Sequence, residues 1–137
     1  MTVRYLADKS ALIRLNQDSV AEELAPRLNL GLVATCPIID LEMLYSARNA
    51  ADHAMAASER FRLPSVDMDR SVTDRALAIQ ALLAQRGQHR LPISDLLIAA
   101  AAEVNGLVVL HYDAGFDRIA DVTGQQTEWI VPKGSVA

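Results

Sequence analysis

The sequence predicts an α/β protein in which helices cover a central parallel sheet. Short apolar runs, such as 3–7 and 107–110, alternate with longer segments whose apolar residues recur at helical spacing. This alternation is typical of parallel sheets with right-handed crossovers, which bring the carboxyl ends of the strands to one edge. The 137 residues are 51% hydrophobic, which is ample for a core without disulfides. We therefore expect residues 1–137 to form a single domain.

The first half of the chain predicts two strands and four helices. The expected strands cover 3–7 and 31–35, and the expected helices cover about 10–16, about 18–29, a segment that begins at Pro37, and 51–62. Proline suits a first helical turn, which supports a helix start at Pro37. Residues 63–66 are expected to form a brief strand or a connector.

The second half predicts three more helices and two strands. A helix over 69–85 is indicated by apolar residues at helical spacing, with Gly87 suited to end it. Residues 86–90 are the clearest polar loop. The other expected elements are a helix at 95–105 with Ser94 as its N-cap, a strand at 107–110, a helical turn at 115–121 and a strand near 128–131.

Four acidic residues occupy positions where an isolated carboxylate would be costly. Asp8 and Asp113 follow predicted strands, Glu42 lies three and four residues after Ile39 and Ile38 on an apolar helix face, and Asp95 begins a helix that is apolar nearly all round. Ligands of open α/β sheets bind at the carboxyl edge of the strands. We therefore expect these four acids to converge there around a shared cation.

Carboxylate clusters of this kind suit Mg²⁺, with Mn²⁺ as a possible substitute. One or two such ions can bind a phosphodiester oxygen, promote deprotonation of an attacking water and neutralise the leaving oxygen. Other interpretations stay open for single residues. Asp95 alone could complement the helix dipole, and Asp8 and Asp113 could be turn residues, whereas Glu42 on an apolar face is harder to explain that way.

Several classes of function are disfavoured by the sequence. The net charge of −4 argues against a broad basic surface for nonspecific DNA binding. The glycines never approach the spacing of a nucleotide-binding loop, so we do not expect ATP or NAD. His53, His89 and His111 lack zinc-site spacing and are expected at the surface. Cys36 is expected to be a small buried side chain.

The same survey favours a cytoplasmic protein. No apolar run approaches the roughly 18 residues of a membrane span. The first residues lack the apolar segment of a secretory signal, and a single cysteine cannot form an internal disulfide.

Four stretches together resemble the PIN-domain family, and in particular the VapC ribonuclease toxins of bacterial type II toxin–antitoxin pairs. They are Asp8-Lys9-Ser10-Ala11-Leu12, Glu42 in its apolar helix, the run from Pro92 to Ala101, and the run from Val109 to Ile119 with its Asp-x-x-Phe-x-x-Ile ending. The resemblance covers almost the full chain. It implies a PIN-like three-layer α/β/α domain with the activity of a Mg²⁺-dependent endoribonuclease that is restrained by a VapB antitoxin.

The resemblance also implies roles for individual residues. Asp8, Glu42, Asp95 and Asp113 fall on the family's acidic catalytic and metal positions, Ser10 falls on its supporting hydroxyl, and Asp117 is a secondary candidate. The chain departs from the family's pattern at Lys9, where Thr is common, and at Gly115, where a further Asp is frequent.

Partners follow from the resemblance as well. It implies a homodimer and a hetero-oligomer with the antitoxin, whose carboxyl-terminal segment would lie in an apolar groove formed by residues about 10–29 and 38–62. RNA phosphates could be contacted by the basic residues Lys9, Arg14, Arg48, Arg86, His89 and Arg90. As single residues, these could equally be solvated surface charges.

Two alternatives remain at this stage. One is a PIN-like binding module whose acids do not support turnover. The other is a receiver-like phosphoacceptor domain, which also gathers acids and Mg²⁺ at a sheet edge but would place its acids directly after strands, unlike Glu42 and Asp95. The sequence does not indicate which RNA a nuclease would cut.

Overall fold

The computed structural model describes residues 2–137, which form a four-stranded parallel sheet and seven helices. The strands are β1 (Tyr5–Ala7), β2 (Val33–Ala34), β3 (Val108–His111) and β4 (Thr127–Trp129), in the order β2-β1-β3-β4. In the register, Leu6 of β1 lies between Ala34 of β2 and Val109 of β3. Since all neighbouring strands are parallel, their carboxyl ends share one edge. The predicted fold class is confirmed.

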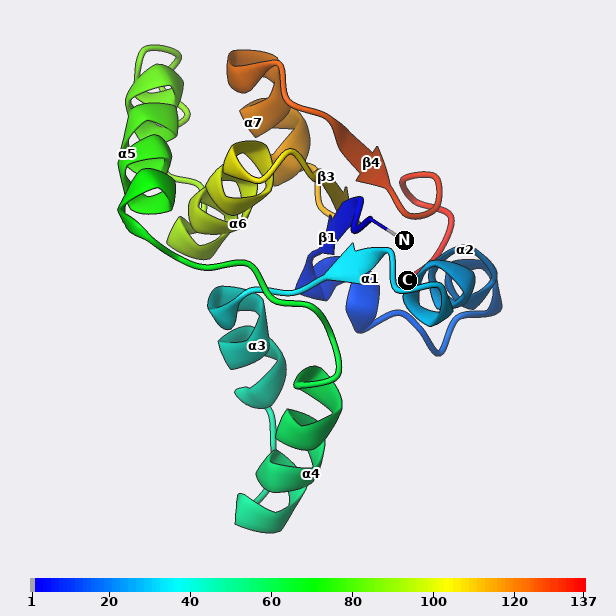
Figure 1. Cartoon of the computed structure of the whole chain (residues 1–137). Helices are drawn as coiled ribbons and strands as arrows, with labels where there is room; N and C mark the ends of the chain where they lie inside the picture. Colours follow the sequence, from blue (N-terminus) through cyan, green and yellow to red (C-terminus); the bar gives the residue numbers. More distant parts are fainter. Residues whose placement is uncertain (1) are drawn as a thin grey trace.

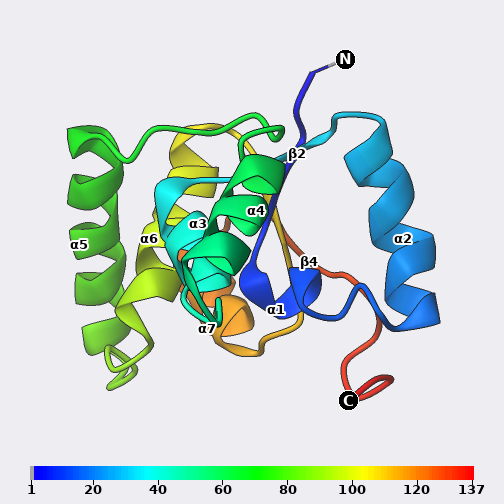
Figure 2. The same cartoon turned by 90° about the horizontal axis from the view of Figure 1, so that it is seen from below.

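Helices flank this sheet on both faces. They are α1 (Lys9–Leu12), α2 (Asp18–Asn29), α3 (Pro37–Leu44), α4 (Ala50–Arg60), α5 (Arg70–Ala84), α6 (Ile93–Val104) and α7 (Gly115–Thr123). Helix α2 lies on one side of the sheet and α5 and α6 lie on the other (Figures 1 and 2). Within residues 2–137, none of these helices has the length and hydropathy needed to cross a bilayer.

The core lies on both faces of the sheet, against α6 on one side and against Val20 and Leu24 of α2 on the other. Leu6, Val109 and Leu110 of the strands are fully buried, and so are Ile98 of α6 and Phe116 of α7. Helix α6 is buried along most of its length, as its nearly uniform apolar sequence predicts. Its burial beside the sheet brings its first turn, with Asp95, to the carboxyl edge of the strands.

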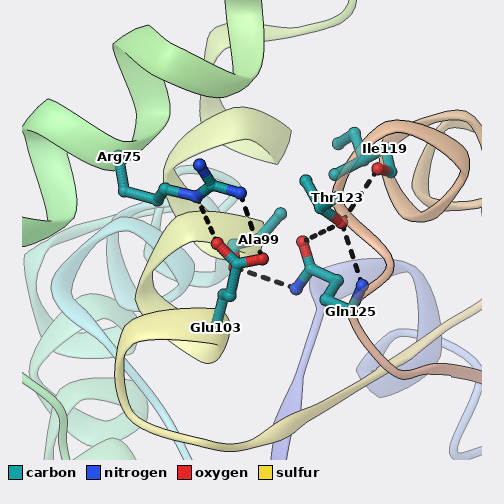
Figure 3. Close-up of polar contacts among 6 residues, drawn as sticks. All are labelled: Arg75, Ala99, Glu103, Ile119, Thr123 and Gln125. Atoms are coloured by element: carbon teal, nitrogen blue, oxygen red, sulfur yellow. Dashed lines mark hydrogen bonds and ion pairs between the residues drawn. The ribbon is translucent and has the colours of Figure 1, made fainter. Parts of the chain in front are cut away.

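Polar contacts fasten α6 to its neighbours at the opposite end from Asp95 (Figure 3). Arg75 of α5 forms an ion pair with Glu103 of α6. The Gln125 side-chain amide, which follows α7, donates to the Ala99 carbonyl at 3.0 Å. The Thr123 hydroxyl lies within 3.2 Å of the Gln125 Oε1 atom and receives the Gln125 backbone N–H at 3.1 Å. These contacts hold α5, α6 and α7 as one layer.

Helices α3 and α4 form an arm that extends away from the rest of the molecule (Figure 1). No residue of α4 is buried. The arm is anchored at its base, where Arg60 donates to the Asp40 carboxylate at 2.8 Å and to the Thr35 hydroxyl at 2.6 Å. The Thr35 hydroxyl donates in turn to Asp40 at 2.7 Å. One polar network therefore joins β2, α3 and α4.

Most predicted elements are present, with shifted ends. Helix α1 stops at Leu12, not near residue 16, because the amides of Arg14, Leu15 and Gln17 bond three residues back in tight turns. Residues 63–66 contribute only an isolated bridge, between Ser65 and Thr35.

The predicted start of the helix that carries Asp95 is wrong. Helix α6 begins at Ile93, and the Pro92 carbonyl accepts the first amide bond, from Asp95 N at 3.0 Å. Ser94 is therefore inside the first turn and does not cap the helix. The prediction for Cys36 is confirmed, since this free cysteine is fully buried. Gly87 follows α5 with φ of +68°, as expected for a residue that ends a helix.

Candidate active site

The four acids predicted to converge line one hollow at the carboxyl edge of the sheet. Asp8 follows β1, Asp113 follows β3, Glu42 comes from α3 and Asp95 comes from the first turn of α6. The hollow has a volume of about 340 Å³. Its other lining residues are Lys9, Ser10, Ile13, Arg14, Pro92, Ser94 and Tyr112.

Asp8 is held rigidly at the entrance to α1. Its backbone N–H donates to the Leu110 carbonyl at 2.9 Å, which ties it to the neighbouring strand β3. Its Oδ2 atom accepts the Ser10 N–H at 3.0 Å and so caps α1. The Ser10 hydroxyl accepts the Tyr112 N–H at 2.8 Å. The predicted supporting hydroxyl therefore braces the backbone that leads to Asp113, while the Ser10 N–H contacts Asp8.

Asp113 is fixed by a turn after β3. Its Oδ1 atom accepts the Gly115 N–H at 2.8 Å, and its own N–H donates to Nδ1 of His111 at 3.2 Å. A Cβ atom at Gly115 would lie 3.3 Å from Asp113 Oδ1 and 3.5 Å from Asp95 Oδ2. The glycine thus leaves room beside two carboxylates.

Asp95 and Glu42 each have a carboxylate oxygen that is buried without a hydrogen-bond partner among residues 2–137, Asp95 Oδ2 and Glu42 Oε1. Burial, followed by the charges of Asp8, Asp113 and Glu42, raises the pKa of Asp95 to about 7. Burial and the charge of Asp8 also raise the pKa of Glu42, against opposing effects of the Lys9 charge and of the Ser94 side chain. These two acids therefore favour a proton or a cation at their free oxygens, and Asp95 does not simply cap its helix.

The donor set of the hollow suits a hard divalent cation. Within residues 2–137, no group of three or more Asp, Glu, His or Cys side chains is placed so that it could hold a metal ion. Mg²⁺ does not require such a group, because it usually keeps several waters and binds proteins through one or two carboxylates. The unpartnered oxygens of Asp95 and Glu42 and the space beside Gly115 fit that mode of binding.

The other candidate residues divide into two groups. Lys9 and Arg14 line the hollow, whereas Arg86 and Arg90 lie in the loop before α6 and do not. Asp117 does not line the hollow either. Its two oxygens accept the Trp129 indole N–H at 3.1 and 3.2 Å, which ties α7 to β4.

The expectation that His111 lies at the surface is wrong. It is fully buried in β3, with its ring 5.1 Å from that of Phe116 and 5.0 Å from that of Trp129. Burial lowers its pKa, so the neutral ring that accepts the Asp113 N–H is favoured. The reason for the error is that β3 continues one residue beyond the apolar run from which it was predicted.

Tyr112 is a site residue that the sequence analysis missed. It lines the hollow, and its ring lies under the Arg14 guanidinium, with Arg14 Cζ 4.5 Å from the ring centroid. Its position between the predicted strand at 107–110 and Asp113 could have indicated a place at the site. Residue type alone, however, does not show on which side of the chain the phenol ring lies.

Comparison with known proteins gives one consistent result. The PIN domain family matches residues 5–122. Ribonuclease VapC51 of Mycobacterium tuberculosis is 49% identical over 138 residues, covering 99% of both chains. Ribonuclease VapC21 of the same species is 44% identical, covering 98% of this chain and 99% of its own.

Solved structures show the same fold. A DNA-bound VapBC from Salmonella typhimurium superposes with a TM-score of 0.74 at 22% identity, covering 92% of this chain and 97% of that one. At this identity the likeness concerns the fold alone. Together with the family match, it excludes the receiver-like alternative, whose acids would follow strands directly.

Proposed function

The chain belongs to the PIN-domain family, and from this premise we propose that it is a Mg²⁺-dependent endoribonuclease that hydrolyses RNA phosphodiester bonds. The observation that carries the proposal is the shared hollow of Asp8, Glu42, Asp95 and Asp113, with two buried oxygens lacking a partner among the described residues. Full-length relatives named ribonucleases support RNA as the substrate.

In this proposal the four carboxylates would hold Mg²⁺, one or two of them directly and the others through its waters, and Mn²⁺ can substitute. When bound, the ion would act as a Lewis acid toward the phosphate and would lower the pKa of a water so that it ionises more readily at neutral pH. Asp8 and Asp113 are held by backbone N–H groups, so their carboxylates stay in place without a bound ion. Because the pKa of Asp95 is about 7, its ionised form, which is the form that would bind the ion, becomes dominant only above neutral pH in the metal-free protein.

The basic residues of the hollow have a complementary role. The charge of Lys9 opposes the rise in the pKa of Glu42 and so favours the charged form of this carboxylate. Lys9 and Arg14 at the hollow, and Arg86 and Arg90 farther along the chain, are the proposed contacts for RNA phosphates. Such contacts would offset the repulsion between RNA and a protein of net charge −4.

We also propose that the activity is restrained by a VapB-type antitoxin, as the VapBC names of the structural relatives suggest. The arm of α3 and α4 is a suitable docking surface, because Leu41, Tyr45, Met55 and Phe61 are between 66% and 89% exposed. A hollow lined by Lys9, Leu41, Glu42 and Tyr45 joins this surface to the acids. An antitoxin segment on the arm would therefore reach Glu42.

The proposal extends to the organisation of the chain. We propose that residues 1–137 act as one PIN-like domain that forms a homodimer and a hetero-oligomer with the antitoxin. The free, buried thiol of Cys36 suits the reducing cytoplasm, which is the proposed compartment.

The deciding experiment is digestion of total bacterial RNA by the purified protein, followed by sequencing of the new ends. We expect discrete cuts with Mg²⁺, none with EDTA, and none with the Asp8→Asn variant. This substitution removes one carboxylate charge with little change in the shape of the side chain. Thermal unfolding of the variant checks that it is folded. Cuts that persist in EDTA or in folded Asp8→Asn would contradict the proposal.

The same experiment addresses the alternative of a PIN-like binding module. Such a module would bind RNA or an antitoxin but would yield no metal-dependent cuts under any condition. The mapped ends would also identify the RNA target, which the described residues do not specify.

A further inference from the structure

Arg14 differs from the arginines that form ion pairs. Five arginines pair with carboxylates, namely Arg27, Arg48, Arg60, Arg70 and Arg75. Arg14 lines a hollow with four acids, yet within residues 2–137 it forms no ion pair with an Asp or Glu side chain. Its positive charge is therefore not neutralised by any of the acids that surround it in the hollow.

The Arg14 guanidinium is nevertheless held in place. Its Nε donates to the main-chain oxygen of Ala137, the last residue of the sequence, at 3.0 Å, and its Nη1 donates to the Ser10 carbonyl at 2.6 Å. Its Cζ lies 4.5 Å from the centroid of the Tyr112 ring. The Ser10 carbonyl and the ring face orient the guanidinium without cancelling its charge, and the Ala137 oxygen occupies only its Nε–H. Since arginine has five N–H donors, three remain free of protein partners in the described part of the chain.

Tyr112 is fixed by the segment that follows β4. Its hydroxyl donates to the Val136 carbonyl at 2.8 Å and accepts the N–H groups of Gly134 at 2.8 Å and Val136 at 3.2 Å. One phenol therefore joins residues 134–136 to the edge of the hollow. The same segment supplies the main-chain oxygen of Ala137 that orients Arg14.

We propose that Arg14 is a phosphate-binding residue of this site, and that Tyr112 and residues 134–137 are positioning elements that hold its free N–H groups toward a phosphate of bound RNA. This inference rests on the proposed function and identifies Arg14 as the residue that holds an RNA phosphate at the site. The planar guanidinium can bind a phosphate through two parallel N–H bonds. An anchor that is already oriented loses less side-chain freedom on binding than a mobile surface arginine.

The test measures binding of a fluorescein-labelled, single-stranded RNA of mixed sequence by anisotropy, in Mg²⁺ and over a series of potassium chloride concentrations. The protein carries Asp8→Asn so that the RNA is not cut. Adding Arg14→Gln should weaken binding about tenfold, as expected for loss of a charge-assisted contact. It should also reduce the slope of log K against log salt by about 0.7, the value for one phosphate contact of a single strand.

Arg4 offers a matched control. Its Cζ also lies over a tyrosine ring, that of Tyr5 at 5.9 Å, but at the amino end of β1, away from the hollow. Arg4→Gln removes the same charge, so it should leave both the affinity and the salt slope nearly unchanged. Arg14→Lys should keep the salt slope and lose part of the affinity for RNA, because lysine keeps the positive charge but lacks the planar, two-pronged donor geometry of the guanidinium.

Tyr112→Phe tests the positioning elements separately. It keeps the ring beneath Arg14 and removes the three hydroxyl bonds, so amide hydrogen exchange at Gly134 and Val136 should accelerate. Binding should weaken by a smaller factor, about threefold, with an unchanged salt slope. Faster exchange with unchanged affinity would overturn the positioning role.

The phosphate-binding role would be overturned if Arg14→Gln matched Arg4→Gln in both affinity and salt slope. Failure of the proposed function has a different signature. No cuts by the wild-type protein would contradict the nuclease while leaving the salt slopes of the Asp8→Asn proteins interpretable.

Discussion

Two acids on the same helix have opposite surroundings. Asp40 of α3 belongs to the base of the arm, where it accepts bonds from Arg60 and Thr35. Glu42, two residues later, belongs to the acidic hollow, where its Oε1 atom is buried without a partner within residues 2–137. Both regions concentrate polar groups at the end of a parallel sheet, but only the arm base satisfies them internally.

The difference separates an acid that the fold pairs internally from acids that remain available to a ligand. A buried carboxylate without a partner costs free energy, and a fold tolerates such groups mainly where a ligand or chemistry uses them. At the arm base, the Arg60 guanidinium compensates Asp40. In the hollow no cation of the described chain compensates Asp95, and burial, followed by the charges of Asp8, Asp113 and Glu42, raises its pKa to about 7. The comparison predicts that the two regions respond differently to the same substitution.

The largest expected effect is on RNA cleavage. Asp95→Asn should reduce the rate about a thousandfold or more, because loss of a ligand removes several kcal/mol of metal-dependent transition-state stabilisation. Asp40→Asn should leave the chemical step nearly intact and lower only the stability. Single-turnover cleavage at saturating protein, on an RNA chosen from the mapped cut sites, compares the two. Equal losses of rate in two folded variants would remove the distinction between the regions.

The second effect concerns the stability of metal-free protein. Because the folded pKa of Asp95 is about 7 and the ordinary value is 3.8, the folded state binds this proton more tightly than the unfolded state. The contribution of Asp95 to stability is therefore greatest below pH 4 and is lost as the pH rises to about 7. Asp95→Asn lacks this loss, so at pH 8 in EDTA it should be more stable than wild type, by about 2 to 3 kcal/mol.

Urea unfolding at several pH values measures this difference, which should shrink toward zero as the pH falls to about 4. Asp121→Asn serves as the control, since it removes an exposed carboxylate from α7 and should show no such pH dependence. If Asp95→Asn were no more stable than wild type at pH 8, the hollow would not be electrostatically strained, and its contrast with the arm base would fail.

The fold and the four acids were predictable from sequence because both depend on local patterns. Strands that end in an acid and apolar helices that carry one are visible along the chain, and a parallel sheet brings such positions to one edge. The shift of α6 by two residues did not matter, because Asp95 remained in the first turn of a buried helix.

Contacts between distant segments were not predictable. The pairing of Asp40 with Arg60 depends on how α4 folds back along α3, which no periodicity records. The bonds from Tyr112 to residues 134–136 cross 22 to 24 positions of sequence, and Arg14 meets Ala137 across 123. His111 was misplaced for a related reason, since Phe116 and Trp129 bury it from two other elements.

The smallest expected effect concerns the arm base itself. Arg60→Gln removes the cation that compensates Asp40, and its side chain is only 12% exposed, so it should lower the free energy of unfolding by about 1 to 2 kcal/mol. Arg48→Gln breaks another ion pair of the same arm, with Asp52, but Arg48 is 84% exposed and should change stability by less than about 0.5 kcal/mol. Urea unfolding of both variants gives the comparison.

Since Arg60 lies outside the hollow, folded Arg60→Gln should still cleave RNA when its stability suffices. If instead it lost cleavage while staying folded, the arm base would take part in holding Glu42, and the division between structural and functional acids on α3 would have to be redrawn.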